Sequence, residues 1–181
     1  MTEETRPADP PPVVAVADEV DDVTRAVLAA SHLLVSISTR ALAAAAGDGV
    51  TPAQFRMLDV LVSRRHVKLV ALAGVMAVNP STAMRMVDRL IAAGLADRRP
   101  NRENRRETVL TATDSGARLV ATVTARRRAE TAALLARLGH AERAGLVGAL
   151  GALAAAGGEP ADVDPHGFPQ PLGWTEPHFP G

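Results

Sequence analysis

The sequence predicts a mainly α-helical domain with one small β-hairpin. The composition is 47% apolar but only 2% aromatic, so the core is aliphatic, and its abundant Ala and Leu favour helix. Apolar residues recur near the helical period along most of residues 18–156, while residues 95–112 hold two short segments around a polar turn. A length of 181 residues fits one domain with tails.

The first part of the chain predicts a disordered arm and two helices. Residues 1–17 begin acidic and proline-rich, which favours disorder. Val and Leu at helical spacing predict a helix over 18–46, which "GDG" at 47–49 breaks. Thr51 and Pro52 then predict a new helix start, as N-cap and first helical residue, with Phe55, Leu58, Leu61 and Val62 facing inward.

The middle of the chain predicts two short helices joined by a tight turn. Leu69, Leu72, Ala73 and Met76 form an amphipathic stripe, and Ala77 and Val78 turn the chain. Asn79 and Pro80 predict the start of the next helix, and Gly94 suits its end. This spacing is typical of a helix-turn-helix.

The remainder predicts a hairpin, two helices and a tail. Residues 95–99 and 107–112 are expected to be paired strands around a polar turn. Thr113 is expected to cap a helix over about 114–138, followed by an Ala-, Leu- and Gly-rich helix over about 141–156. Residues 157–181 contain six prolines and five glycines, so they predict a tail without regular structure, although its Trp174, Phe168 and Phe179 leave docking as an alternative.

Charge is distributed unevenly along the chain although the formal net charge is zero. Residues 64–106 carry ten Lys or Arg against three Asp or Glu, a net of +7, whereas residues 1–63 carry −5 and residues 107–181 carry −2. A basic block of this kind indicates a polyanionic partner.

The helix that starts at Asn79 has the arrangement of a DNA-recognition helix. At about 100° per residue, Ala83, Val87, Leu90 and Gly94 share a buried side flanked by Met86 and Ile91. Ser81, Arg85 and Asp88 lie opposite, with Thr82 and Arg89 at one edge and Met84 at the other. Small hydroxyls can approach phosphates, and an arginine can bind guanine in bidentate fashion. An ordinary solvated helix face is the alternative for this helix taken alone.

Arginines after this helix favour DNA recognition over an ordinary solvated helix face. Arg98, Arg99, Arg102, Arg105 and Arg106 fall within nine residues of the expected hairpin. Arginines at a hairpin tip suit the narrow, electronegative minor groove.

Residues 51–116 resemble the MarR family of winged helix-turn-helix transcription regulators, through "TPAQFRMLDVL", "LVALAGVMAVNPSTAMRMVDRLIAAGLADRR" and "NRRETVLTATDSG". The resemblance implies a winged-helix regulator domain over 18–156, with a DNA-binding lobe at about 51–112 and dimerisation helices at about 18–46 and 114–156. It implies a homodimeric DNA-binding repressor or activator, of which a repressor is expected, that binds a pseudo-palindromic double-stranded operator. The family's wing Asp-x-Arg is Asn104 and Arg106 here, and Met84 replaces a frequent hydroxyl residue. The DNA-binding residues expected are Asn79, Ser81, Thr82, Met84, Arg85, Arg89, Arg102, Asn104, Arg105 and Arg106.

The resemblance also implies a small-molecule effector that releases the DNA, in a pocket between the dimer helices and the DNA-binding lobe. By placement, the lining residues expected are His32, Ser36, Arg40, Phe55 and Leu58. A winged-helix protein-interaction module that does not regulate through DNA is the alternative function.

Other classes fit the sequence poorly. Asp59, Ser63 and His66 are close along the chain, but this spacing alone does not make a catalytic triad, so no enzyme activity is expected. The five histidines are scattered and there is no cysteine, so neither a metal nor a cofactor is predicted. We see no signal peptide and no apolar run of membrane-spanning length, which predicts a cytoplasmic protein without a membrane partner.

Overall fold

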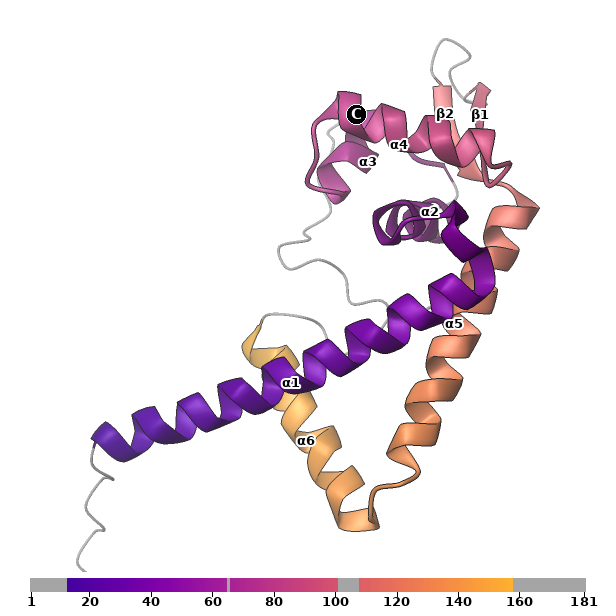
Figure 1. The fold of residues 1–181 in the computed structure, drawn as a ribbon. Coiled ribbons are helices and arrows are strands. Elements are labelled where there is room, and N and C mark those ends of the chain that lie inside the picture. The colour runs from indigo at the N-terminus through magenta and orange to yellow at the C-terminus, as the bar shows by residue number, and fades with distance from the viewer. Residues whose placement is uncertain (1–12, 65, 101–107, 158–181) are drawn as a thin grey trace, which may run out of the picture. The chain divides into compact units, whose positions relative to one another are not determined.

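A computed structural model describes residues 13–64, 66–100 and 108–157 (Figure 1). The predicted fold class is confirmed, since the described chain is mainly helical with one two-stranded antiparallel hairpin. In chain order the elements are α1 (Val13–Ala46), the 3₁₀ turn η1 (Gly47–Gly49), α2 (Pro52–Arg64), α3 (Leu69–Val75), α4 (Pro80–Ala92), β1 (Ala96–Pro100), β2 (Thr108–Ala112), α5 (Asp114–Leu135) and α6 (His140–Ala156).

Several predictions lie outside the described residues. They concern the arm over 1–12, the tail over 158–181 with its three aromatic residues, and the hairpin tip with Arg102, Asn104, Arg105 and Arg106. Residues 13–17 were predicted to belong to the arm, but α1 begins at Val13. The prolines end at Pro12, and the "VVAVA" that follows contains nothing that interrupts a helix.

The chain divides into two compact units, one ending at Ser36 and the other beginning at Ile37. The side chains of unit 1 from Asp18 onward are exposed, including most of the apolar residues of the predicted stripe. In unit 2, Ile37, Ala41 and Leu42 of the same helix are buried. Within unit 2, the second part of α1 therefore belongs to the core.

The prediction that the chain has no apolar run of membrane-spanning length is wrong for α1. By length and composition, Asp18–Ala46 is apolar enough to cross a membrane, and α3 with α4 passes the same test only if the two are counted as one span bent by 102°. Arg40 is the only charged residue between Ala26 and Ala46. The Ser, Thr and His residues there lower the mean hydropathy of the segment too little to exclude it as a membrane span. Helices that pack against protein meet the same criterion.

The core of unit 2 is centred on α2. Phe55, Leu58 and Leu61 are buried as predicted. Met57, which was not among the residues predicted to face inward, is also fully buried. The start of α2 is a capping box, in which the Thr51 hydroxyl accepts from Gln54 N (3.2 Å) and Gln54 Oε1 accepts from Thr51 N (2.8 Å). α2 contacts α4, α5 and β2, so it supports both the helix-turn-helix and the hairpin.

The helix-turn-helix consists of α3, a short turn and α4. Ala77 occupies the turn with φ of 52°, in the left-handed region that favours glycine. The turn is closed by hydrogen bonds from Ala77 N to Gly74 O (3.0 Å) and from Val78 N to Ala73 O (3.1 Å). α3 and α4 then pack against each other through their apolar sides.

The hairpin follows α4 and forms the wing. Ala96 pairs with Ala112 and Arg98 with Leu110, whereas Asp97 pairs with Thr111 on the alternate positions. Val67 extends the sheet by one bridge, donating to Leu110 O (3.1 Å) and accepting from Leu110 N (2.9 Å). The strands thus present alternate residues to opposite faces.

The two C-terminal helices differ in burial. α5 buries Gly116, Val120 and Val123, and Thr113 caps it as predicted. α5 ends at Leu135 rather than near 138, because Arg137 N and Leu138 N bond to Leu134 O and Leu135 O in a tighter last turn. No residue of α6 is buried, and Val147 is 75% exposed.

Candidate nucleic-acid interface

The N-terminus of α4 is organised by Asn79. Its Oδ1 accepts from Thr82 N and from the Ser81 hydroxyl, each at 2.8 Å, and Pro80 occupies the first helical position. This satisfies an amide that would otherwise lack a partner at the start of the helix. Asn79 and Ser81 therefore shape the end of the helix that would approach a phosphate.

The predicted faces of α4 agree with its burial. Ala83, Val87 and Leu90 are buried, and Met86 and Ile91 are partly buried beside them. Gly94 was expected on the same buried side, but it is exposed, because the helix has ended and the glycine takes φ of 71° in the turn to β1. The outward face carries Ser81, Arg85 and Arg89, all exposed.

Arg85 lies on the outward face of α4. Its Nη2 donates to Thr82 Oγ1 at 3.1 Å, one turn toward the helix N-terminus, and its side chain is exposed. Arg89 follows one turn later. Two guanidinium groups and small hydroxyls thus share one exposed face, as direct recognition of base edges requires.

Arg98, on β1, links the wing to α4. Its Nη2 forms an ion pair with the Asp88 carboxylate and also contacts Met84 Sδ. Asp88 and Met84 are four residues apart, so they lie on adjacent turns of one helix face. Met84 is therefore partly covered from the wing side, a contact that residue spacing did not predict.

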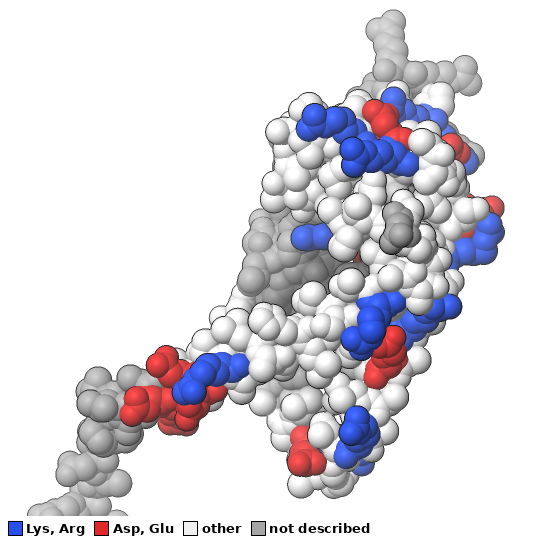
Figure 2. Space-filling view, viewed as in Figure 1, with Lys and Arg blue, Asp and Glu red and all other residues white. Residues whose placement is uncertain are grey.

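Basic side chains gather at this end of unit 2. Figure 2 shows Lys and Arg side chains over the region that carries α4 and β1, with acidic side chains between them. Arg99 pairs with Asp97 at 3.3 Å on the opposite face of the hairpin from Arg98.

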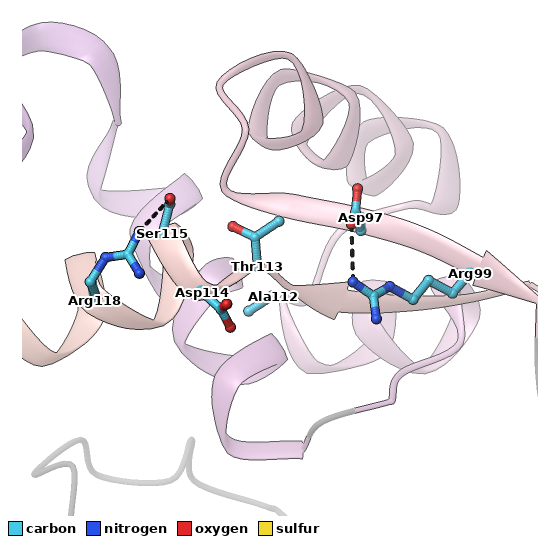
Figure 3. A pocket seen from close by; sticks show the side chains of 7 residues that line it. All are labelled: Asp97, Arg99, Ala112, Thr113, Asp114, Ser115 and Arg118. Carbon is cyan, nitrogen blue, oxygen red and sulfur yellow. Dashed lines mark hydrogen bonds and ion pairs between the residues drawn. The ribbon is translucent and has the colours of Figure 1, made fainter.

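A shallow polar pocket of about 430 Å³ lies at the base of the wing (Figure 3). In it, Arg118 donates to the Ser115 hydroxyl at 2.9 Å, and Arg99 keeps its bond to Asp97. Two arginines and two aspartates balance the charge of the pocket, so it has no excess positive charge for an anion. The residues that line it are Asp97, Arg99, Ala112, Thr113, Asp114, Ser115 and Arg118.

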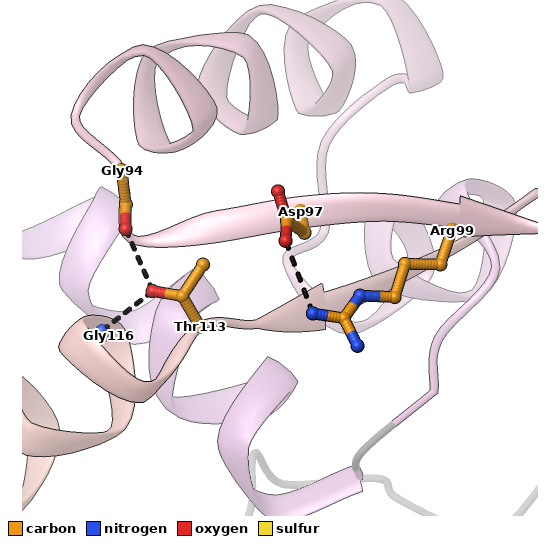
Figure 4. Close-up of polar contacts among 5 residues, drawn as sticks. All are labelled: Gly94, Asp97, Arg99, Thr113 and Gly116. Atoms are coloured by element: carbon orange, nitrogen blue, oxygen red, sulfur yellow. Dashed lines mark hydrogen bonds and ion pairs between the residues drawn. The ribbon is translucent and has the colours of Figure 1, made fainter.

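The start of α5 is joined to the end of α4 (Figure 4). The Thr113 hydroxyl donates to Gly94 O (2.8 Å) and accepts from Gly116 N (3.1 Å), while Thr113 N donates to Leu95 O (3.0 Å). A Cβ at Gly116 would lie 2.2 Å from Leu95 O, so only glycine permits this approach. We refer to Gly94, Leu95, Thr113 and Gly116 as the α4–α5 joint.

The residues expected to line an effector pocket are divided between the two units. His32 and Ser36 lie in unit 1, where the Ser36 hydroxyl donates to His32 O at 2.9 Å. In unit 2, Arg40 pairs with Glu130 at 3.0 Å, and Phe55 and Leu58 are buried in the core. The two core residues already pack against other side chains of the chain itself.

The residues considered for catalysis have structural partners. The Ser63 hydroxyl donates to the main-chain carbonyl of Asp59 at 2.8 Å, a common arrangement for helical serine. The Asp59 side chain is buried, and burial lowers the pKa of Arg127 while the Asp59 carboxylate opposes that shift. Within residues 13–157, leaving out 65 and 101–107, no group of three His, Asp or Glu side chains is placed to hold a metal ion.

Comparison with known proteins agrees with this geometry. Residues 50–108 match the MarR family. No curated protein sequence matches the chain significantly. The crystal structure of RV1404 from Mycobacterium tuberculosis is 43% identical, with a TM-score of 0.70, covering 80% of this chain and 97% of that one.

Two more distant structures share the fold. Apo MarR from E. coli is 26% identical with a TM-score of 0.52, covering 67% of this chain and 92% of that one. A point mutant of S. aureus MepR bound to an oligodeoxyribonucleotide is 17% identical with a TM-score of 0.60, covering 74% and 96%. With the helix-turn-helix, the wing and the identity to RV1404 together, the chain belongs to the MarR family of winged helix-turn-helix transcriptional regulators, DNA-binding proteins without enzymatic activity.

Proposed function

We propose that the protein is a homodimeric repressor that binds a pseudo-palindromic operator in double-stranded DNA. The outward face of α4 carries this proposal, since Arg85 and Arg89 are exposed there beside small hydroxyls. α4 enters the major groove, while the wing, including Arg102, Asn104, Arg105 and Arg106, contacts the minor groove and phosphates. Asn79, Ser81, Thr82 and Met84 complete the proposed DNA-binding set.

The test is a fluorescence-anisotropy titration with the protein's own promoter DNA and a scrambled duplex at two salt concentrations. Binding should weaken steeply with salt, because phosphate contacts release counterions. Arg85→Ala should cost about 1–3 kcal/mol and relax preference at one base pair. Arg126→Ala, which removes an exposed arginine from α5, is the matched control and should bind like wild type.

Two results would contradict the proposal. Absence of binding at low salt would favour the alternative, a winged-helix module that binds protein rather than DNA. Operator binding by Arg85→Ala at wild-type affinity would show that this face of α4 does not read the DNA.

The dimer partner is a second copy of the chain, which covers apolar side chains that one copy leaves in solvent. α6 exposes Leu146, Val147, Leu150 and Leu153, and unit 1 exposes Val20, Val23, Leu28 and Leu34. Burial of such surface contributes about 25 cal/mol per Å².

Leu150→Asp should convert the dimer to monomers in sedimentation velocity and lower operator affinity. Val70→Asp places the same charge at an apolar position of α3 that is also exposed, and it should leave the dimer intact. Dimers that persist in Leu150→Asp would argue against α6 as the interface.

A small-molecule effector is proposed to release the DNA by changing the separation of the two recognition helices. The residues that the family resemblance suggests for its lining are His32, Ser36, Arg40, Phe55 and Leu58, of which the buried Phe55 and Leu58 would have to become accessible before they could contact a ligand. MepR of S. aureus, which shares the fold, has been solved with ethidium bromide. A thermal-shift screen against aromatic acids and cations should find a compound that stabilises the protein and weakens operator binding. No resident cofactor or metal is proposed, and the site of action is the cytoplasm, where the DNA lies.

A further inference from the structure

Arg98 and Asp88 connect the wing to the outward face of the recognition helix. The Arg98 guanidinium forms an ion pair with the Asp88 carboxylate and contacts Met84 Sδ, so it spans one turn of α4. The alternation of side chains along β1 directs Arg98 toward α4. Arg98 lies on the same face of β1 as the buried Ala96, whereas Asp97 and Arg99 lie on the other face.

The ion pair is too exposed to be explained by its contribution to folding. The side chains of Arg98 and Asp88 are 40% and 55% exposed, and pairs of this kind contribute little to stability. Asp88 is also the only acidic residue of α4. A carboxylate on a face that meets phosphate would repel DNA unless a cation neutralised it.

We propose that Arg98 is a positioning residue for DNA reading. It holds the base of the wing against α4, neutralises Asp88 and keeps Met84 at the wing edge of the helix, instead of contacting a phosphate. This inference rests on the proposed operator binding. It assigns Arg98 a role in the ratio of operator to non-operator affinity, which is the specificity ratio.

Asp88→Asn distinguishes a positioning role from a simple electrostatic effect, because the two predict opposite changes in operator affinity. Removing an acidic charge near DNA should raise affinity for every duplex. Loss of positioning should lower operator affinity at least about threefold, on the scale of coupling between contacting residues, while non-operator affinity stays unchanged or rises. An increase in affinity for both duplexes would overturn the proposal.

Arg98→Gln gives a second, independent readout. A phosphate contact would reduce the salt slope of binding by about 1 when removed, whereas a positioning residue leaves the slope unchanged. The exchange Asp88→Arg with Arg98→Asp preserves the pair and the net charge, and it should recover part of the specificity that each single variant loses. A reduced slope in Arg98→Gln, or an exchange no better than the single variants, would overturn the assignment.

The matched control is the neighbouring pair on the other face of the same strand. Asp97→Asn and Arg99→Gln make the same charge changes on the opposite face of β1 from Arg98, where Arg99 pairs with Asp97. These variants should leave the specificity ratio unchanged. A loss equal to that of the Arg98 variants would attribute the effect to charge alone.

A measurement without DNA keeps this inference distinguishable from the proposed function. With ¹³C-methyl methionine, the Met84 methyl resonance should shift in Arg98→Gln and Asp88→Asn but not in Arg99→Gln. If the wild type fails to discriminate the operator, the proposed function fails, and the methyl shifts still report whether Arg98 holds Met84. Unchanged Met84 shifts in both variants would overturn the contact.

Discussion

α4 and α6 belong to the same unit, yet they meet solvent in opposite ways. α4 buries Ala83, Val87 and Leu90 and presents a polar face, whereas α6, with 17 residues that are mostly Ala, Leu and Gly, buries none. An amphipathic helix is satisfied by its own chain and leaves its polar face for a partner of different chemistry. A helix that is apolar all round requires a second apolar surface. This difference fits the two partners proposed, DNA for α4 and a second copy of the chain for α6.

The largest expected effect comes from removing equivalent leucines from the two helices. Leu90→Ala, at a side chain that is 1% exposed, should cost about 2–5 kcal/mol of unfolding free energy. Leu150→Ala should change the folding of one chain by less than about 0.5 kcal/mol and raise the dimer dissociation constant. Urea denaturation and sedimentation velocity measure the two quantities. Equal losses at concentrations where only monomer is present would show that α6 packs within its own chain.

Glycines sharpen the same contrast. Gly116→Ala places a Cβ against the Leu95 carbonyl and should cost about 1–3 kcal/mol or more. A Cβ added at Gly145 of α6 would meet nothing within 4 Å, so Gly145→Ala should gain about 1 kcal/mol of helix propensity in one chain. Thermal denaturation of both variants tests this. A Gly145→Ala penalty confined to the dimer would place a second copy in close contact there.

Helix caps should give a smaller effect. Asn79→Ala removes the acceptor for Thr82 N and should cost about 1 kcal/mol, with a parallel loss of operator affinity. Ser81→Ala keeps the bond from Thr82 N to Asn79 Oδ1, so it is the control for stability only. Equal stability of Asn79→Ala and wild type in urea would show that the start of α4 is held by packing alone.

The smallest change concerns the start of α6. Gly139 is its N-cap and offers no side-chain acceptor, while Glu142 Oε2 accepts from Gly139 N at 2.6 Å. Gly139→Ser should add a few tenths of a kcal/mol, because serine supplies the missing oxygen. A gain as large as the loss in Asn79→Ala would contradict this ranking.

The elements of the winged helix were predictable because their signals are local. Thr51–Pro52, Asn79–Pro80 and Thr113 begin helices where the residue types satisfy free amides, and the inward residues of α4 follow one period. The turn residue Ala77 was predicted, but its left-handed conformation was not. Nothing in an alanine signals positive φ, and closure between α3 and α4 imposes it.

The contacts of the site that were missed are long-range. Arg98 and Asp88 are ten residues apart on different elements, and their pairing depends on how the hairpin folds back along α4. Spacing likewise places Asp59 beside Ser63 as a possible catalytic neighbour, although the Asp59 side chain is buried and its carboxylate acts on the pKa of Arg127 on α5. Pairings of this kind follow from tertiary packing, so residue spacing does not reveal them.

The α4–α5 joint has a mechanical consequence. At Gly116 the helix backbone rests directly on the Leu95 carbonyl, without a side chain between them that could change rotamer and absorb a displacement. Thr113 fastens the same two segments with hydrogen bonds on both sides. We therefore expect a tilt of α5 to displace the end of α4 by a similar amount. In the proposed dimer, a change in the packing of helices remote from DNA would thus change the separation of the two recognition helices.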